Sequence, residues 1–329
     1  MSVGSSPWLD GWEPEPGREH TLQVLDVARR YYEDGMSQAQ IAAAIRYSRP
    51  TVGRILKEAR TTGVVQIRVT NPLERALELE RVISARFGVA NVRVTPSAST
   101  VDGIAEAGDS TAQILPRILR PGTRVGLSAG RIHGYVAEHI RPGPACHPTF
   151  VQMVGNLSED SIVMNGAELC RQFADRLGGV AVTIDAPLLA RTGEEARAIR
   201  SQAKVAKALQ QAAGVDVAIV GVGAGFHHAT GVFTSLLSTA NIRALRKQGA
   251  VGHILAQFFD KDGNVVGEPV QDLVIGLRVE QLRSIPHVIG IAAGAHKAEA
   301  LKAALRGRLL NGLILDRSAA QSLAYSDDN

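Results

Sequence analysis

The sequence has few of the residues on which extracellular, membrane-spanning or aromatic-rich proteins depend. Its two cysteines, Cys146 and Cys170, are too few for a disulfide framework and are typical of small buried side chains in a reducing cytoplasm. No apolar run reaches the roughly 20 residues that a helix needs to cross a bilayer, so no membrane partner is expected. Aromatic residues make up only 4% of the chain. We therefore expect α/β packing rather than an aromatic-rich β-sandwich.

Residues 1–17 lack the basic start and apolar core of a signal peptide, and their prolines, glycines and acids predict a flexible tail. The rest of the chain has no internal repeat and no low-complexity tract. Hydrophobic residues make up 45% and charged residues 21% of its 329 residues. This composition and length predict a soluble globular protein with two domains.

Charge is distributed unevenly along the first part of the chain. Residues 1–35 hold three arginines against seven acids, a net charge of −4. Residues 36–70 hold five arginines and one lysine against Glu58 alone, a net charge of +5. The whole-chain net charge of +4 hides this contrast. A local basic excess favours a polyanionic partner, because cations that neutralise phosphates supply the salt-dependent part of nucleic-acid affinity.

The basic segment has the order and spacing of a helix-turn-helix. A helix over 38–45 and a turn over 46–48 lead into a second helix, with Ser48 as its N-cap and Pro50 in its first turn. A preceding helix over 18–34 can cover this pair. The apolar residues expected to face inward are Leu22, Leu25, Ala28 and Tyr32 in the first helix, Ile41, Ala44 and Ile45 in the second, and Val52, Ile55, Leu56 and Ala59 in the third.

The outer face of the third helix presents cations beside the almost bare backbone of Gly53. Such a face suits the major groove of DNA, whereas a solvated basic surface is the plainer alternative. The candidate DNA-contacting residues are Gln38, Arg49, Pro50, Thr51, Gly53, Arg54 and Lys57. We therefore expect residues 18–70 to form a domain that binds double-stranded operator DNA. An alternating segment over 64–69 predicts a strand, either a wing or the first pairing with the next domain.

From residue 71 onward, buried strands alternate with helices. This order predicts an α/β domain over 71–329 with a doubly wound, mostly parallel sheet. Strands are expected at 89–94, 124–127, 150–154, 180–184, 216–221, 287–292 and 313–316, and a hairpin at 253–260 and 264–266. Helices are expected at 73–87, 103–119, 133–140, 166–177, 194–213 and 297–305.

Three expected strand-to-helix turns combine glycines with anion-binding side chains. They cover residues 126–131, 221–225 and 293–297. The carboxyl ends of parallel strands meet at one edge of a sheet, where helix N-termini bind ligands. Glycines that simply make tight turns are the alternative for any one of these loops, but together the three predict a pocket for a small anionic or polyhydroxylated molecule. The candidate lining residues within these turns are Ser128, Ala129, Gly130, Arg131, Gly221, Gly223, Gly294 and Lys297.

Two patterns in these loops point to other chemistries. Residues 126–130 match the G-x-S-x-G nucleophile elbow of serine hydrolases. A triad would need Asp216 or Asp260 together with His253, His287 or His296, and no oxyanion loop of the HGGG type lies upstream. The loop after Gly221 fails the dinucleotide pattern G-x-G-x-x-G because residue 226 is Phe. The histidines 227, 228 and 253 lack metal-ligand spacing, so neither a metal nor a cofactor is expected.

Several motifs in the same order resemble the SorC-type sugar-binding transcriptional regulators, over about residues 20 to 325. Residues 216–223 are similar to that family's D-x-A-x-V-G-I-G, and residues 249–263 to its G-A-V-G-D-I, F-F-D and G. Residues 285–307 are similar to its I-P-x-V, A-G-G-x-x-K-A-x-A-I and A-L-R-G, and residues 315–320 to its T-D-x-x-T-A. The pairs 186–187 and 151–152 also fit.

The resemblance implies a bacterial regulator of carbohydrate operons, located in the cytoplasm and on the nucleoid when bound to DNA. It implies an effector domain with the fold of sugar-phosphate isomerases and deaminases that binds a sugar, polyol or sugar phosphate without converting it. It also implies a homodimer or homotetramer that holds operator half-sites. An isomerase- or deaminase-like enzyme with a basic appendage is the alternative, and such an enzyme needs a general base.

The chain departs from the family pattern at the expected pocket. Residues 128–132 read Ser-Ala-Gly-Arg-Ile where the family has S-W-G-R-T. The resemblance also places position 253 beside the effector, and this position is His253 where an acid is usual. Ala295 stands where a second glycine is common, and Gly155-Asn156 in place of Gly-Gly. Histidine titrates near neutral pH and replaces a carboxylate acceptor. The effector is therefore expected to differ from the commoner sugar phosphates of the family.

Overall fold

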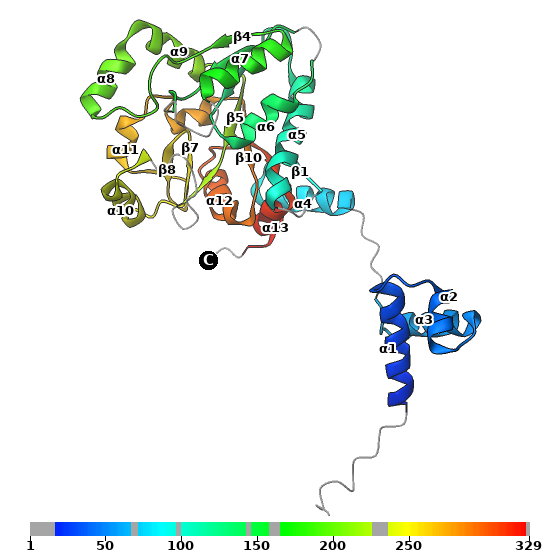
Figure 1. Ribbon diagram of the computed structural model, residues 1–329. Coiled ribbons are helices and arrows are strands. Elements are labelled where there is room, and N and C mark those ends of the chain that lie inside the picture. Colours follow the sequence, from blue (N-terminus) through cyan, green and yellow to red (C-terminus); the bar gives the residue numbers. More distant parts are fainter. Residues whose placement is uncertain are drawn as a thin grey trace, which may run out of the picture. The chain divides into compact units, whose positions relative to one another are not determined.

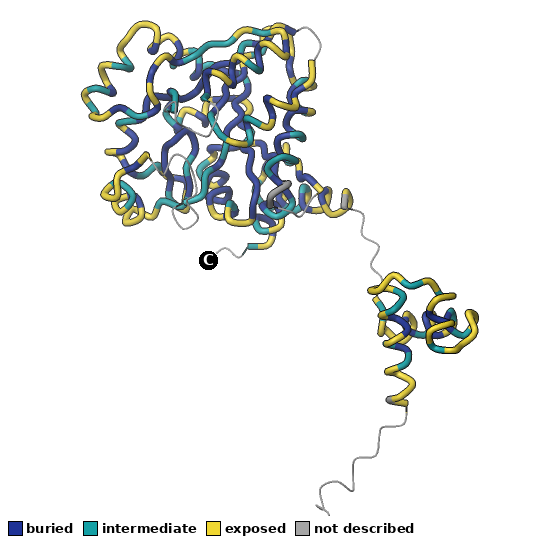
Figure 2. The backbone as a smooth tube through the Cα atoms, viewed as in Figure 1, coloured by how far each residue is buried: buried dark blue, intermediate teal, exposed yellow. Residues whose placement is uncertain are grey.

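The computed structural model of the chain describes residues 17–66, 72–96, 100–142, 146–157, 165–225 and 236–326. The chain divides into two compact units, Met1–Thr70 and Asn71–Asn329, whose elements are drawn in Figure 1. Each unit has its own buried interior, which is dark blue in Figure 2. None of the helices in the described ranges is long and apolar enough to cross a membrane.

The first unit is built from three helices, α1 (Arg18–Tyr32), α2 (Gln38–Ile45) and α3 (Arg49–Thr61). The expected cap of the third helix is confirmed, since the Ser48 side chain accepts a hydrogen bond from the Thr51 backbone N–H at 3.2 Å. Ser37 caps α2 in the same way and forms a reciprocal capping box with Gln40. Both helix starts are therefore fixed by local sequence, which sets the length of the turn between α2 and α3.

The core of this unit is only partly the one expected. All four apolar residues predicted for α3 are buried. On α1 the buried stripe is Val24, Val27 and Ala28, whereas Leu22 is 57% exposed and Tyr32 40% exposed. The stripe that packs against α3 thus lies on a different side of α1 from Leu22, because these buried residues follow one another at helical spacing.

Two further expectations for the first unit concern the buried residues of α2 and the strand after α3. On α2, Ala42 is buried beside Ile41, and Ala44 is exposed. The strand expected over 64–69 is not present at residues 64–66, where the chain bends after α3. Residues 67–69, including Arg68, lie outside the described residues, as do residues 1–16 of the expected tail.

The second unit contains a seven-stranded sheet in which every neighbouring pair is parallel. The strand order is β1-β11-β10-β5-β2-β3-β4. The predicted α/β doubly wound architecture is confirmed. The strands are β1 (Asn91–Val94), β2 (Arg124–Leu127), β3 (Thr149–Gln152), β4 (Val180–Val182), β5 (Val217–Gly221), β10 (His287–Ala292) and β11 (Gly312–Leu315).

Helices cover both faces of this sheet, as the central strand β5 makes clear. Its residues Val217 and Ile219 belong to one apolar cluster, whereas Ala218 and Val220 belong to another. A strand buried on both faces needs a continuously apolar sequence. The helices of the unit are α4 (Pro72–Phe87), α5 (Thr100–Ile118), α6 (Arg131–His139), α7 (Gly166–Leu177), α8 (Gly193–Ser201), α9 (Ala203–Ala213), α10 (Thr239–Lys247), α11 (Glu268–Leu273), α12 (Ala298–Arg306) and α13 (Arg317–Tyr325).

A small antiparallel sheet is added beside the carboxyl end of β5. It consists of β6 (Gly223–Ala224), β7 (Gly252–Ile254), β8 (Gln257–Phe259) and β9 (Val265–Val266), paired in that order. The single strand predicted over 253–260 is therefore wrong. Leu255 and Ala256 adopt left-handed backbone conformations, with φ of 50° and 61°, and turn β7 back into β8. The helix expected over 194–213 is likewise two helices, because the extended backbone of Gln202 separates α8 from α9.

Candidate functional site

The carboxyl ends of β2 and β5 lie side by side at the centre of the parallel sheet. From β2 the chain continues outward to β3 and β4, whereas β5 pairs on its other side with β10. This reversal of strand order is the topological switch point, where open α/β sheets form a ligand crevice. The three loops predicted from the sequence follow β2, β5 and β10, so the fold brings all of them to this one edge.

These loops surround a pocket of about 260 Å³. The small antiparallel sheet contributes to it as well, through His253 of β7. All nine residues predicted as effector candidates line this pocket, namely Ser128, Ala129, Gly130, Arg131, Gly221, Gly223, His253, Gly294 and Lys297. The sequence analysis thus selected residues that share one cavity, although up to 169 positions separate them in the chain (297 − 128).

Ser128 and His133 connect the end of β2 to β5 at the pocket. The Ser128 hydroxyl accepts a hydrogen bond from the Gly221 backbone N–H at 3.1 Å. The His133 Nε2 lies 3.0 Å from the Ile219 carbonyl oxygen and 3.4 Å from Ser128 Oγ. A carbonyl can only accept, so Nε2 carries the proton and cannot take one from Ser128. Burial lowers the pKa of His133 to about 4, although its hydrogen bond to the Ile219 carbonyl raises the pKa slightly. At this pKa the ring is neutral at physiological pH.

The serine-hydrolase alternative finds no further support in the described residues. Asp216 precedes β5 and pairs with Arg124 at 3.5 Å, and His287 begins β10, so both lie at the opposite ends of their strands. The Asp260 carboxylate accepts backbone N–H bonds from Asp262 and Asn264 within a turn. Among the residues that the structure describes, neither nominated aspartate therefore lines the pocket beside Ser128 and His133. This geometry favours a structural role for Ser128.

His253 forms part of the pocket floor. It is paired in register with Gly223, and a Cβ atom at position 223 would overlap its imidazole ring. Only glycine at 223 leaves room for the ring. The His253 ring also packs on Phe258, with ring centroids 5.3 Å apart. Desolvation, and then the nearby charge of Lys297, lowers the pKa of His253 to about 3. His253 is therefore neutral at physiological pH.

Two cations, Arg131 and Lys297, line the pocket and lie close enough to repel each other. Burial, and then the proximity of Arg131, lowers the pKa of Lys297 to about 8. Lys297 is therefore mostly charged at pH 7 and Arg131 is always charged, while none of the described residues that line the pocket is an acid. The helix α6 also begins at Arg131 without a side-chain cap, so its first N–H groups open onto the same loop. This arrangement favours an anion.

The loop before Lys297 depends on a glycine. Gly294 has a φ of 100°, a conformation that side-chain-bearing residues rarely adopt. Its backbone N–H donates to the carboxylate of Asp316 at 2.9 Å. Asp316 is completely buried and also caps α13. The loop is therefore held from behind by a residue that the sequence analysis did not select.

The pocket walls are apolar, and sequence reasoning did not identify them. They are formed by Ile104, Ile132, Val154, Leu157, Leu188, Val222, Leu255, Ala256, Ile291, Ala292 and Ala293, with His133 and His296 as further polar members. Ordinary core periodicity explains most of these residues, so no local signal separates them from the interior. Only the tertiary arrangement distinguishes a wall from a core position.

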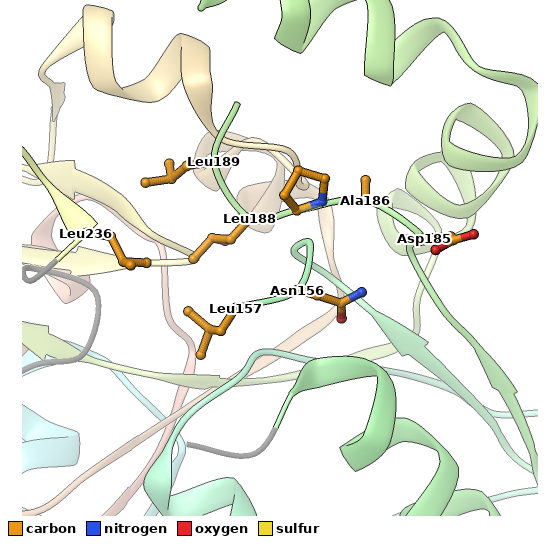
Figure 3. Close-up of a pocket in the computed structure, with 8 residues that line it drawn as sticks. Asn156, Leu157, Asp185, Ala186, Leu188, Leu189 and Leu236 are labelled. Carbon is orange, nitrogen blue, oxygen red and sulfur yellow. The ribbon is translucent and has the colours of Figure 1, made fainter. Parts of the chain in front are cut away.

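A second, wider pocket of about 510 Å³ adjoins this site (Figure 3). Leu157 and Leu188 line both pockets, and Leu236 closes the second one from a separate segment. Asn156 at its edge is held by the backbone, since its side-chain nitrogen donates to the Ile184 carbonyl oxygen at 3.1 Å. The two leucines thus form a shared apolar wall.

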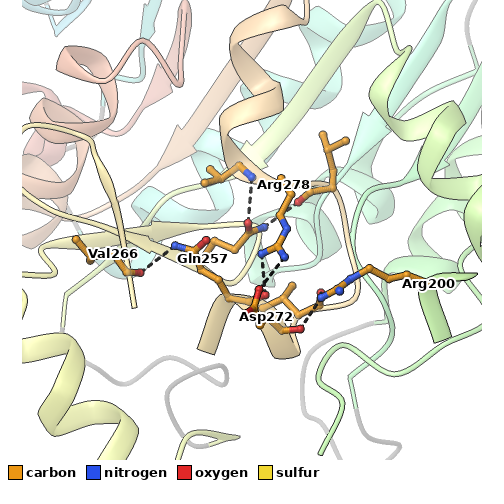
Figure 4. A network of polar contacts seen from close by, with 9 residues as sticks. Arg200, Gln257, Val266, Asp272 and Arg278 are labelled. Carbon is orange, nitrogen blue, oxygen red and sulfur yellow. Dashed lines mark hydrogen bonds and ion pairs between the residues drawn. The ribbon is translucent and has the colours of Figure 1, made fainter. Parts of the chain in front are cut away.

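The turn at Leu255–Ala256 that lines the main pocket is supported by a polar network (Figure 4). The Gln257 amide nitrogen donates to the carbonyl oxygens of Leu255 and Leu277, and its oxygen accepts from the Val279 N–H. Arg278 bonds Asp272 at 3.0 Å, and Arg200 of α8 donates to the Asp272 carbonyl oxygen. These bonds fix the small sheet against α8 and α11.

In the first unit, the candidate DNA-contacting residues lie on the exposed side of α3 and the start of α2. Arg49, Pro50, Arg54 and Lys57 are exposed, whereas Gln38, Thr51 and Gly53 are half-buried. A Cβ atom at Gly53 would lie 3.6 Å from the Gln38 side-chain oxygen, so the two helices are close at this point. The nearby acid Glu58 pairs with His20 of α1 at 2.6 Å.

The cations of this face keep their charge available to a partner. Arg46, Arg49, Arg54, Lys57 and Arg60 are all exposed, and none makes an ion pair with a described residue. An exposed array of unneutralised cations on adjacent helices is the electrostatic footprint of a phosphate-binding surface. The histidines 227 and 228 considered for metal binding lie outside the described residues.

A helix-turn-helix with an unneutralised basic face, followed by a parallel α/β unit with a ligand crevice at its switch point, defines a ligand-responsive transcriptional regulator. The sequence profile of the family described as "Putative sugar-binding domain" matches residues 71–324. The chain therefore belongs to the SorC-type sugar-binding transcriptional regulators, and the resemblance noted in its sequence is confirmed.

Similar proteins span nearly the whole chain. A deoxyribonucleoside regulator from Bacillus subtilis is 28% identical over 308 residues, covering 93% of this chain and 98% of the relative. The transcriptional regulator LsrR from Enterobacter sp. is 30% identical over 308 residues, with 91% and 92% covered. The crystal structure of the full-length sorbitol operon regulator SorC from Klebsiella pneumoniae matches with a TM-score of 0.71 at 25% identity, over 92% of this chain and 98% of that one.

Proposed function

We propose that this regulator binds operator DNA through α2 and α3, and that a small anionic sugar derivative bound in the switch-point pocket controls that binding. The observation that supports the proposal most directly is the convergence of the nine candidate residues on one cavity with two cations and no described acid. A phosphorylated sugar or polyol supplies both the negative charge and the size for a cavity of about 260 Å³.

On the DNA side, α3 is the recognition helix. Its N-terminal residues Arg49 and Thr51 and its exposed Arg54 lie on the face that would enter the major groove, and Lys57 extends that face toward the phosphates. Gln38 at the start of α2 is placed to contact the backbone beside them. Arginine pairs with guanine in a bidentate manner, so Arg54 is the residue most suited to reading sequence.

On the effector side, the charge of the pocket selects for an anion. Arg131 and Lys297 stay positive while His253 is neutral, so a bound phosphate meets two cations and the uncapped start of α6. The names of the relatives, a deoxyribonucleoside regulator and a sorbitol operon regulator, are in keeping with a small sugar-derived effector. We infer binding without turnover, because a proton-transfer reaction in this pocket would need a positioned base such as a carboxylate.

One chain presents one recognition helix, so tight operator binding requires further copies. Helix-turn-helix proteins commonly bind two half-sites about one helical turn of DNA apart, with protein symmetry matching operator symmetry. We infer that two or four copies of this chain act together. The domain assignment follows: residues 18–70 contact DNA, and residues 71–329 bind the effector and carry the self-association.

The proposal is tested with the full-length protein and promoter fragments from its own locus. We expect a labelled fragment to be retained at low ionic strength and its affinity to fall steeply with salt. Pentose and hexose phosphates, tested beside their unphosphorylated parents, should include a phosphorylated compound that both raises the unfolding temperature and changes retention. That compound should be recovered unchanged. Absence of retention under every condition would refute DNA binding.

The Lys297 ammonium predicts a pH dependence of effector binding. An anion is attracted only by the protonated amine, and the pKa of Lys297 is about 8. A phosphate monoester is already doubly ionised above pH 7, since its second pKa is about 6. Its dissociation constant should therefore rise by about tenfold between pH 7 and pH 9.5. Titration calorimetry at several pH values measures this, and Lys297→Gln should flatten the profile. An equal slope in both proteins would contradict the assignment.

A further inference from the structure

Helix α13 is held at both of its ends by charged side chains. At its start, one carboxylate oxygen of Asp316 accepts the N–H of Ala319 at 2.9 Å and the N–H of Gly294 at 2.9 Å. The other oxygen accepts the Ser318 hydroxyl at 2.6 Å and packs against Gly103 of α5. Asp316 therefore joins α13 to the pocket loop that leads to Lys297.

At its other end, α13 is joined to α4. Arg86 of α4 donates to the Ala324 carbonyl oxygen at 2.8 Å and to the Ser326 carbonyl oxygen at 2.9 Å. Ala324 lies in the last turn of α13 and Ser326 is its C-cap, so the guanidinium sits at the helix C-terminus, where a cation is favoured. Apolar residues of the two helices also pack together, among them Ile83 of α4 and Leu323 of α13. Figure 1 shows α13 beside α4.

The chain itself links α4 to the DNA-binding unit. The first unit ends at Thr70, and α4 begins at Pro72. The pocket loop, Asp316, α13, Arg86 and α4 thus form an unbroken series of hydrogen-bonded and packed elements that ends one residue from the unit carrying α3. Because α13 is hydrogen-bonded at both ends, we expect a shift of the loop at Gly294 to be passed along the helix to its far end.

We propose that α13 transmits the state of the effector pocket to α4, with Asp316 and Arg86 as the positioning residues that couple the two ends. This inference rests on the proposed function, because it assigns a path from the pocket to DNA. If Asp316 and Arg86 only stabilised the fold, a change in the pocket would not alter the affinity for DNA. If they couple the two ends of α13, the pocket and the DNA-binding unit share a measurable coupling free energy.

The test is a double-mutant cycle that needs no effector. Lys297→Glu inverts the charge of the pocket loop, and the affinity of the full-length protein for its own promoter fragment is measured with and without this change. We expect Lys297→Glu to change that affinity at least about fivefold. In the Arg86→Gln and Asp316→Asn backgrounds the same change should have less than about a twofold effect. Arg81→Gln, which alters an exposed arginine on the same helix, is the matched control and should preserve the full response.

Two results would overturn the proposal. One is an equal response to Lys297→Glu in the Arg86→Gln and Arg81→Gln backgrounds, and the other is no response in the otherwise unchanged protein. Arg86→Lys is a milder variant, in which one ammonium replaces two guanidinium donors, and its coupling should be intermediate. Arg86→Lys replaces Arg86→Gln as the test variant if Arg86→Gln unfolds the chain.

Hydrogen exchange gives a second measurement that does not depend on DNA. In the full-length protein, Lys297→Glu should alter amide exchange in α4 over residues 76–83, and Arg86→Gln should confine the change to the loop and α13. If the unaltered protein does not bind promoter DNA, the proposed function fails while this measurement still decides the path. Exchange in α4 that is unaffected by Lys297→Glu would overturn the path alone.

Discussion

Replacing Arg54 and Lys57 with alanine together is expected to weaken binding to the promoter fragment by at least about 100-fold. Each residue is exposed on the outer face of α3 and has no acid partner among the described residues. Loss of a base-reading arginine typically costs about 1–3 kcal/mol, and loss of a phosphate-contacting lysine lowers the salt dependence by about one ion. Electrophoretic retention at several salt concentrations measures both quantities.

The fold of this double variant should be intact, because neither side chain belongs to the buried stripe of Val52, Ile55, Leu56 and Ala59. Its unfolding temperature and its stabilisation by a phosphorylated sugar should equal those of the unaltered protein. Arg29→Ala removes an exposed arginine from α1 and is the matched control, which should retain DNA. Equal retention by the double variant and this control would remove α3 from the interface.

Gly223→Ala is expected to weaken effector binding by about 10- to 100-fold. A methyl group at this position would overlap the His253 imidazole, which must then turn into a pocket of about 260 Å³. Overpacking of this kind costs about 1–3 kcal/mol, and a ligand would have to displace the ring against that cost. Titration calorimetry with the phosphorylated sugar that most stabilises the unaltered protein measures the loss, while DNA retention without effector should persist.

Gly134→Ala is the matched control for this substitution. Gly134 lies within α6, and a Cβ atom there would meet nothing within 4 Å. Alanine in a helix is favoured over glycine by up to about 1 kcal/mol, so this variant should be slightly more stable. Its effector affinity should not change. Similar affinities in the Gly223→Ala and Gly134→Ala proteins would exclude the ring displacement as a determinant of binding.

The sequence predicted most polar residues of the pocket because they follow buried strands at glycine-containing turns, whereas His253 within β7 was predicted by the family resemblance. Ser128, Gly221 and Gly294 all have this local signature, and the parallel sheet then brings their strand ends together. Helix α3 was predicted for a similar reason, since Ser48, Pro50 and the stripe from Val52 to Ala59 are signals contained within this helix and its cap.

Features that depend on distant contacts were not predictable in this way. The buried side of α1 is chosen by α3, and Leu22 offers no local sign that it faces solvent. The turn at Leu255 and Ala256 places two ordinary residues in left-handed conformations, which glycine or asparagine would have signalled. Asp316 was recognised only as part of a motif, because its bond to Gly294 spans 22 positions of the chain.

The order in which the pocket is completed along the chain has a consequence for damaged copies of the gene. Among the described residues, the last one that lines the pocket is Lys297, whereas the third helix of the first unit ends at Thr61. A messenger RNA that ended early, for example after β5, would yield a fragment with the three helices of the first unit and an incomplete pocket. Because residues 71–329 also carry the proposed self-association and β10 pairs with β5, we expect such a fragment to hold the promoter only weakly and to respond to no metabolite.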